Sequence, residues 1–412
     1  MEKRFLREGF KKVSSLLLCL ITTSLYSQDL DHYLYIARSN NPKLKTAQNF
    51  YESSREAVNE AGSLPNTTFS AGYFIQETET PIGPMRARIS AQQQFPWFGT
   101  LHAKKQSARS AAQATSLQVQ IAEKVLTRDV KQHYYALFLD NTALTTQKKH
   151  LKILESYEEL ALKELENKRS SMIDILKIRI CLNNLKNTIE TSEENLQTGI
   201  KAFNLLLNRD ITLPVIIPDS LAVVTPDFKK ENIIHNPALL ELDARKEALV
   251  QSEIVSKKEG LPSIGVGLDY IWVDEQPAGN IPDNGRDIIM PMVSVSLPLF
   301  SKKYSSRQKQ LQWEQQAVEN KKTNVKNELE VLFDKSISAM TNAYRKIMTL
   351  KENTKQAEKA ENVFLTTYQT SKIDFQELLE ILELKLNFQM ETIEATKTFF
   401  DNRILLEYIT AI

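Results

Sequence analysis

Apolar residues recur at helical spacing over two long stretches that are almost free of helix-breaking residues. Between Trp97 and Leu213 there is no proline, and from Leu299 onward there is neither proline nor glycine. Both stretches are rich in Leu, Lys, Glu, Gln and Ala, which favour helices. In the first, apolar residues follow three-, four- and seven-residue steps, as in coiled coils. The pattern predicts long helices folded back into hairpins, the first from about residue 100 to 168. A bundle of ordinary, shorter helices is the alternative.

Glycine and proline are concentrated instead in residues 62–99 and 260–298. Each of these zones contains two segments in which apolar and polar residues alternate, such as Phe69, Ala71 and Tyr73 with Ser70 and Gly72 between them. Alternation with a period of two predicts a strand with one apolar and one polar face. The expected strands are about as long as tilted membrane strands, and they lie at about 66–76, 86–95, 263–273 and 288–297.

The two halves of the chain repeat the same motifs in the same order. Asn-Pro-x-Leu occurs at Asn41 and Asn236, and Ser-x-Ile-Asp occurs at Ser171 and Ser371. A Leu-Pro before each first strand and a Pro-x-Phe after each second strand are also duplicated, with offsets between 195 and 202 residues. A repeat of this length indicates a duplicated domain. We expect a first repeat at 28–206, a linker at 207–235 and a second repeat at 236–412.

The first residues have the pattern of a secretory signal peptide. Five basic residues occur within residues 1–12, and an apolar run follows from Ser14 to Tyr26. This run is too short for a membrane span of about 20 residues, so we expect a signal peptide over residues 1–27, cleaved after Ser27. An N-terminal helix that is retained is the alternative. Cys19 follows three leucines rather than a small residue, which does not favour a lipidated cysteine.

Composition argues against several other classes of protein. The net charge of +1 gives no electrostatic reason to expect nucleic-acid binding. The five histidines lack a second histidine or cysteine at metal-ligand spacing, and no Walker-type loop, G-x-S-x-G or H-E-x-x-H motif is present. We therefore expect neither an enzyme nor a bound cofactor or metal.

Four strands in one chain cannot close a barrel, because the smallest barrels use about eight strands. An open sheet edge is not tolerated in lipid, so either the sheet is soluble or several chains share one barrel. Three chains would supply twelve strands. The predicted fold is mainly α-helical with membrane β-strands, a trimeric tube of shared barrel and long helical hairpins. Together with the signal peptide it predicts the outer membrane of a Gram-negative bacterium, with the helices in the periplasm.

The duplicated motifs, in this order and at this spacing, resemble those of outer-membrane efflux proteins of the TolC family. The resemblance covers residues 29–412 and includes the segments around Ser171–Leu176 and Tyr368–Leu379. Phe95-Pro96-Trp97-Phe98-Gly99 is similar to the heavy-metal-efflux branch. Family tips often carry a glycine before the helix restarts, whereas this chain has Arg169-Ser170 and Thr370-Ser371. The resemblance implies a homotrimeric passive export duct in outer-membrane lipid, which docks on a periplasmic adaptor (membrane fusion) protein and an inner-membrane pump.

Several residues are candidates for roles in such a duct. Asp374 and Glu377 are at the tip of the second hairpin and would form rings of carboxylates at the periplasmic aperture. The alternative is that Asp374 is only a charge at a helix start and that Glu377 is on a solvent-exposed helix face. Ser171, Asp174 and Ser371 are candidates for adaptor contacts, and the Ser-x-x-Asp pattern also suits a helix start. Aromatic residues near the predicted strand ends are candidates for the membrane interface, with packing as the alternative: Tyr73, Phe95, Trp97, Tyr270 and Trp272.

Three other functions share parts of this pattern. The same duct could serve a type I protein secretion system, because cargo is chosen mostly by the pump. A periplasmic coiled-coil adaptor is less favoured, because adaptors usually carry one hairpin inside Gly-rich β domains, and this chain has two of similar length. A structural coiled-coil surface protein would need no barrel and would be soluble without detergent.

Overall fold

The computed structural model describes residues 25–166, 171–218, 220–277, 281–299, 302–368 and 375–411. The expected signal peptide lies outside the described residues up to residue 24. Helix α2 (Leu25–Asn40) leads into the first repeat, which comprises α3 (Pro42–Ala61), β1 (Thr68–Thr78), β2 (Met85–Phe95), α4 (Thr100–Glu166) and α5 (Met172–Leu206). A short 3-10 helix, η1 (Lys230–His235), precedes the second repeat of α6 (Pro237–Glu259), β3 (Ser263–Val273), β4 (Ile288–Ser296), α7 (Lys302–Tyr368) and α8 (Phe375–Ile409).

The duplication is visible in the lengths of the elements. Helices α4 and α7 each have 67 residues, and α5 and α8 each have 35. Helix α4 is uninterrupted, so the alternative of several shorter helices is wrong for this stretch. The apolar stripe predicted along it is largely buried, with Leu117, Leu137, Leu144 and Ala161 all in the core. Between α5 and η1, the described part of the linker contains neither helix nor strand.

The chain forms two compact units, and both contain parts of both repeats. One unit contains the residues up to Thr46 together with 120–236 and 327–412, and the other contains 47–119 and 237–326. The long helices α4 and α7 therefore each contribute to both units. A repeat is thus a unit of sequence but not a unit of packing, because its strands and helices pack against those of the other repeat.

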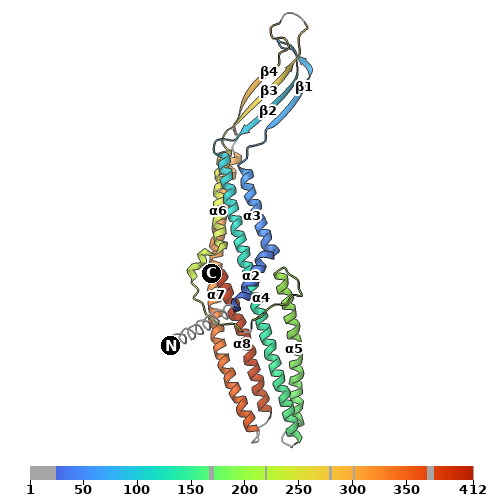
Figure 1. Ribbon diagram of the computed structural model, residues 1–412. Coiled ribbons are helices and arrows are strands. Elements are labelled where there is room, and N and C mark those ends of the chain that lie inside the picture. Colours follow the sequence, from blue (N-terminus) through green and yellow to red (C-terminus); the bar gives the residue numbers. More distant parts are fainter. Residues whose placement is uncertain are drawn as a thin grey trace, which may run out of the picture. The chain divides into compact units, whose positions relative to one another are not determined.

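The second unit contains a four-stranded antiparallel sheet in the order β1-β2-β3-β4 (Figure 1). The β2–β3 pairing, for example Ala91 opposite Leu268, joins the strand pair of one repeat to that of the other. In the same unit α6 contacts both long helices. Lys104 of α4 lies 2.7 Å from Glu259, and Lys246 of α6 lies 2.9 Å from Glu319 of α7.

The duplicated Asn-Pro motif closes helix ends in the first unit. Oδ1 of Asn41 accepts hydrogen bonds from the amides of Lys43 (2.9 Å) and Leu44 (3.2 Å) at the start of α3. Its Nδ2 donates to the carbonyl of Leu206, 3.0 Å away, at the end of α5. Nδ2 of Asn236 donates in the same way to Tyr408 (3.1 Å) and Ile409 (3.0 Å) at the end of α8. Each asparagine thus satisfies carbonyl groups that a helix C-terminus leaves unpaired.

Candidate functional site

The first candidate site is one complete face of the sheet. The register places Phe69 opposite Ala91, Ala91 opposite Leu268 and Leu268 opposite Pro291, so one apolar row crosses all four strands. The rows on either side are mostly apolar, with the polar Gln93 opposite Val266. Because side chains on a strand alternate between faces, every second residue belongs to this face. The face, called here the apolar sheet face, comprises Phe69, Ala71, Tyr73, Ile75, Ala87, Ile89, Ala91, Phe95, Ile264, Val266, Leu268, Tyr270, Trp272, Ile289, Pro291, Val293 and Val295.

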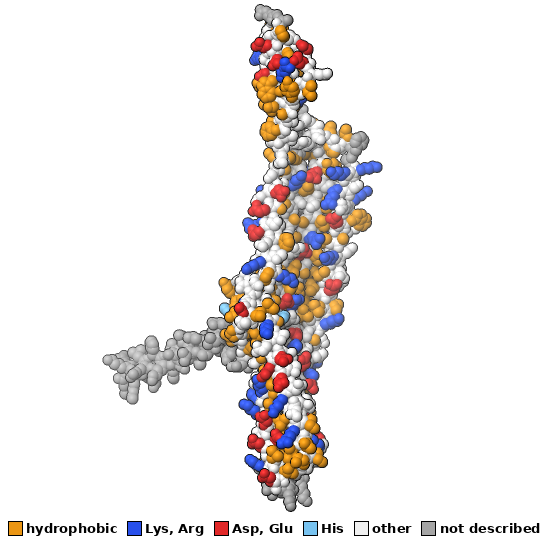
Figure 2. All heavy atoms as spheres, turned by 90° about the vertical axis from the view of Figure 1, so that its right-hand side faces the viewer, with side chains coloured by type: hydrophobic (Ala, Val, Ile, Leu, Met, Phe, Trp, Pro, Cys, Tyr) orange, Lys and Arg blue, Asp and Glu red, His pale blue; other side chains and the backbone are white. Residues whose placement is uncertain are grey.

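The apolar sheet face is uncovered in the single chain. Phe69 is 74% exposed, Val293 is 75% exposed and Leu268 is 51% exposed. Hydrophobic side chains gather over the strands, and charged ones are concentrated towards the hairpin-loop end of the sheet (Figure 2). Soluble monomers rarely leave so large a continuous apolar patch in water. The face therefore indicates contact with lipid or with other protein.

The opposite face carries an ion pair and most of the polar side chains of the sheet, alongside apolar residues such as Ile271 and Met290. Arg88 of β2 forms an ion pair with Asp269 of β3, whose side chain is fully buried. Gln92 donates to the Ser294 hydroxyl at 3.1 Å, and Gln94 donates to the Ser263 hydroxyl at 2.6 Å. The two faces of the sheet therefore differ in polarity, as do the lipid-facing and lumen-facing sides of a membrane β-barrel.

Charged side chains form a band at the hairpin-loop end of the sheet. Arg86 lies 2.6 Å from Glu77 and also forms an ion pair with Asp274. Asp287 accepts a hydrogen bond from the Tyr270 hydroxyl and another, 3.1 Å long, from the amide of Val273. Charges at this end and apolar residues along the strands match the polarity profile of a bilayer boundary.

The five aromatic candidates do not all lie at strand ends. Phe95 is the last residue of β2, and Trp97 follows two residues later. Tyr270 and Trp272 are near the end of β3, with ring centres 5.0 Å apart in an edge-to-face arrangement. Tyr73 is in the middle of β1, because this strand continues to Thr78. Its expected position at a strand end was therefore wrong, although its side chain does project from the apolar sheet face.

The second candidate site is at the tips of the helical hairpins in the first unit. Ser171 is the N-cap of α5, and its hydroxyl accepts from the Asp174 amide at 3.2 Å while the Asp174 carboxylate accepts from the Ser171 amide at 2.9 Å. This reciprocal capping box is the helix-start arrangement that the sequence suggested. Glu377 is exposed in the first turn of α8. Ser371 and Asp374 lie outside the described residues.

The start of α5 also exposes apolar residues that the sequence analysis did not single out. Met172, Ile173, Leu176 and Ile180 are all largely exposed. The last three follow steps of three and four residues, so they lie along one stripe of the helix. This spacing was visible in the sequence, but an apolar helix stripe buried in the core has the same spacing. The sequence therefore could not show which apolar residues are left uncovered by the rest of the chain. The stripe is suited to contact with a second protein chain.

A buried polar network links three helices in the same unit. Glu361 of α7 accepts a hydrogen bond from the Tyr157 hydroxyl of α4 at 2.7 Å and another from the Lys385 ammonium of α8 at 2.6 Å. Desolvation, followed by the contact with Glu361, raises the pKa of Tyr157 well above its usual value. Nε2 of His150 lies 2.6 Å from Oε1 of Gln389. These contacts join the hairpin of one repeat to that of the other.

His150 makes the stability of this unit depend on pH. Its side chain is 2% exposed, its Nδ1 has no hydrogen-bond partner among the described residues, and burial lowers its pKa below the usual value. The neutral ring is therefore favoured in the folded state. Stability is full above the unfolded-state pKa of about 6.5 and falls as the pH drops through that value, because the unfolded chain takes up a proton that the folded site resists.

We expect the midpoint of thermal unfolding to fall between pH 7.5 and pH 5.5 by more in the wild type than in His150→Gln, in scans of the detergent-solubilised protein. Exposed His102 provides the control, and His102→Gln should keep the wild-type dependence. An equal fall in His150→Gln would show that His150 does not contribute to it.

The described residues give no sign of a metal centre or a helical membrane span. Their histidine, cysteine and carboxylate side chains form no group that could hold a metal ion. None of the described helices has an apolar stretch long enough to cross a bilayer.

The fold is that of outer-membrane channel proteins. No protein-family model matches the sequence, and the search of curated proteins found no match. Among solved structures, the chain resembles CusC, which was studied for its transmembrane channel formation, with 14% identity, a TM-score of 0.77, and 93% of this chain and 92% of CusC covered.

Two further structures show the same likeness. The outer membrane protein VceC of Vibrio cholerae is 15% identical with a TM-score of 0.76, covering 92% of this chain and 95% of VceC. The open state of the MtrE outer membrane channel of Neisseria gonorrhoeae is 14% identical with a TM-score of 0.74, covering 93% of this chain and 88% of MtrE. These structures confirm the duplicated, helix-rich fold with four strands per chain.

Proposed function

We propose that this protein is the outer-membrane channel of a tripartite efflux system, a passive duct for cargo delivered by a partner pump. The observation that carries the proposal is the apolar sheet face, exposed across four strands, with the Arg88–Asp269 ion pair on the opposite face. The sheet leaves β1 and β4 as its edges. In lipid these edges must pair, and three copies pairing β1 with β4 give a closed barrel of twelve strands.

The polarity of the two faces supports this assembly. In a closed barrel the apolar sheet face contacts lipid, while Arg88, Gln92 and the hydroxyls of β4 line the lumen. The charged band near Arg86 then lies at the outer surface, and the long helices extend into the periplasm. The likeness to outer-membrane channels, including one in an open state, supports the same function.

The partner interactions follow from the helix tips. We assign the periplasmic adaptor contacts to Ser171, Asp174 and Ser371, together with the exposed stripe of α5. Asp374 and Glu377 form the aperture in this proposal, where three copies bring like charges close to the axis. Tyr73, Phe95, Trp97, Tyr270 and Trp272 contact the bilayer, the last four near its interfaces. Transport energy comes from the inner-membrane pump.

The decisive test is the mass and location of the native protein. We expect it in the outer-membrane fraction and, after detergent extraction, with about three times the mass of one mature chain by light scattering corrected for detergent. A monodisperse single chain that stays soluble without detergent would contradict the proposal, because the apolar sheet face would then be stable in water.

A further inference from the structure

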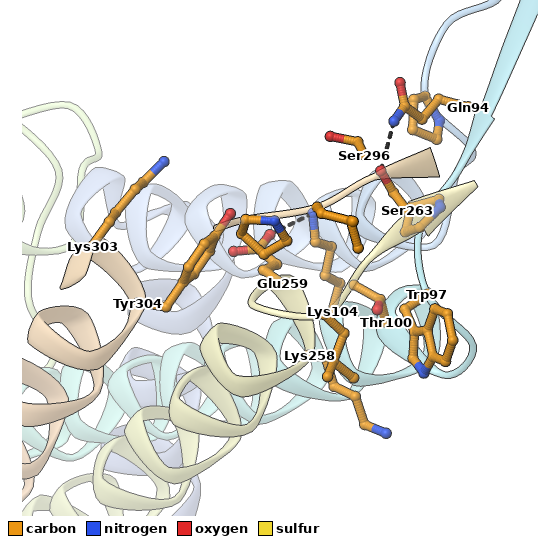
Figure 3. A pocket seen from close by; sticks show the side chains of 15 residues that line it. Gln94, Trp97, Thr100, Lys104, Lys258, Glu259, Ser263, Ser296, Lys303 and Tyr304 are labelled. Carbon is orange, nitrogen blue, oxygen red and sulfur yellow. Dashed lines mark hydrogen bonds and ion pairs between the residues drawn. The ribbon is translucent and has the colours of Figure 1, made fainter. Parts of the chain in front are cut away.

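The helices of the second unit follow the same order as the strands that they adjoin. Helix α3 precedes β1, β2 leads into α4, α6 precedes β3, and β4 leads into α7. Helices α3 and α4 line one pocket together, the ion pair of Lys104 with Glu259 joins α4 to α6 (Figure 3), and that of Lys246 with Glu319 joins α6 to α7. Helices α3 and α7 are therefore the outer helices of this unit, as β1 and β4 are the edges of its sheet.

Each outer helix exposes one large apolar side chain. Among the described helical residues of this unit, only Phe50 of α3 and Trp313 of α7 are large, apolar and more than half exposed, at 66% and 71%. Phe50 lies 11 residues before the end of α3 at Ala61, and Trp313 lies 11 residues after the start of α7 at Lys302. At 1.5 Å per residue, both are about 17 Å along their helices from the ends that lead to the sheet.

Both aromatic residues belong to stripes of exposed side chains. A first stripe on each outer helix is partly or fully buried in the chain, as at Tyr51 of α3 and Leu311 of α7. A second stripe is exposed and also follows steps of three and four residues. On α3 it comprises Phe50, Ser53, Ala57 and Glu60. On α7 it comprises Lys302, Ser306, Lys309 and Trp313. Two such stripes are typical of a helix that has a neighbouring helix on each of two sides.

The two exposed stripes match each other in antiparallel order. Helix α3 runs towards the sheet and α7 runs away from it. With Phe50 level with Trp313, seven residues further along α3 brings Ala57 level with Ser306, seven residues back along α7. Glu60 then falls within one residue of the level of Lys302. Aromatic, small and oppositely charged residues thus meet residues that suit them.

The charges of the two helix ends are also complementary. The last ten residues of α3 contain three glutamates and one arginine, whereas the first eight residues of α7 contain three lysines and one arginine and no acidic residue. Lys303, at the start of α7, points away from Glu259 rather than pairing with it (Figure 3). Complementary charge of this kind favours one partner and one register over others.

We propose that α3 of one copy packs antiparallel against α7 of a second copy of this chain. Trp313 covers Phe50, the small Ala57 and Ser306 allow the two backbones to approach closely, and Glu60 pairs with Lys302. The inference rests on the proposed pairing of β1 with β4, which brings these outer helices of neighbouring copies together. It adds a helical interface in a defined register to the shared sheet.

A pair of cysteines at the two small residues tests this contact. The background is Cys181→Ser, which removes the only cysteine outside the expected signal peptide. Ala57→Cys with Ser306→Cys places two thiols at the same level, and a disulfide needs Cα atoms within about 7 Å. Ala57→Cys with Asn320→Cys is the control, because Asn320 is exposed on α7 but about 21 Å further along the helix. After oxidation of the detergent-extracted protein, we expect covalent trimers on denaturing gels without reductant, with at least tenfold less from the control pair.

The other outcomes separate this interface from the proposed channel. A trimer by light scattering that gives no covalent product from Ala57→Cys with Ser306→Cys overturns the helix contact and leaves the channel intact. Equal yields from both pairs overturn the register, because they would reflect random collision. A disulfide within one chain means that α3 and α7 of the same copy meet, and a covalent product of another mass means that a different protein covers the stripe; both overturn the proposal. A single chain by light scattering contradicts the channel, and the helix contact with it.

Charge reversal gives an independent measurement in the same protein. Glu60→Lys, added to Ala57→Cys with Ser306→Cys, should slow disulfide formation at least about twofold, because attraction to Lys302 becomes repulsion. Adding Lys302→Glu restores opposite charges and should return the rate to within about twofold of the starting protein. A double reversal that stays as slow as Glu60→Lys would overturn the pairing of these two residues.

Discussion

Replacing Leu268 with arginine is expected to abolish most of the folded protein in the outer membrane. Leu268 is in the middle of β3 on the apolar sheet face and is half-exposed in the single chain. An arginine facing lipid near the middle of a membrane strand costs about 2–4 kcal/mol per chain. Denaturant unfolding of the protein in vesicles measures this loss. In a soluble sheet, the same change at an exposed position would cost less than about 0.5 kcal/mol.

A matched variant one residue along the strand ladder gives the contrast. Gln92 pairs with Gly267, next to the Ala91–Leu268 pair, and therefore faces the polar side of the sheet. Gln92→Arg adds the same charge and bulk but should lose only the hydrogen bond to Ser294, worth about 1 kcal/mol. Equal losses in Leu268→Arg and Gln92→Arg would rule out a lipid-facing side.

Replacing Glu361 with alanine is expected to destabilise the first unit by about 3–5 kcal/mol. The carboxylate is buried and accepts hydrogen bonds from Tyr157 and Lys385. Removing it leaves the Lys385 ammonium buried without a counter-charge and the Tyr157 hydroxyl without an acceptor. Thermal or denaturant unfolding, followed by the loss of helical circular dichroism, measures the effect.

An exposed ion pair between the same two helices serves as the control. Lys346 of α7 lies 2.9 Å from Glu391 of α8, and their side chains are 54% and 52% exposed. Glu391→Ala should cost at most about 1 kcal/mol, because water screens this pair. Adding Lys385→Met to Glu361→Ala should recover much of the loss, since the uncompensated charge is then removed. A Glu361→Ala protein as stable as Glu391→Ala would show that burial does not matter here.

The hydrophobic pattern predicted the elements well because it is a local property of the chain. The alternation of apolar and polar residues around Ala71 and Val293 predicted the strands. The absence of proline and near-absence of glycine after Gly99 predicted one long helix, which the structure shows as continuous to Glu166. The motif offsets gave two repeats, in agreement with the paired lengths of the long helices. Ser171 and Asp174 predicted a helix start, because a capping box needs only four neighbouring residues.

The candidate sites were harder to predict, because they depend on which residues distant segments bring together. Asn41 and Asn236 were visible as repeated motifs, but their bonds to the ends of α5 and α8 cross more than 160 residues. Glu361 and Lys385 looked like ordinary charges on long polar helices, since periodicity does not tell a solvated charge from a buried pair.

By itself, then, the sequence determined the duplication, the long helices, the four two-faced strands and the likeness to efflux channels, because these follow from local spacing and residue order. The tertiary structure alone decided that β2 pairs with β3 and so joins the repeats into one sheet with a continuous apolar face. It also decided which charges are buried together, as Glu361 and Lys385 are. Those features arise from the packing of segments far apart in the chain, and they set where lipid and further copies can bind.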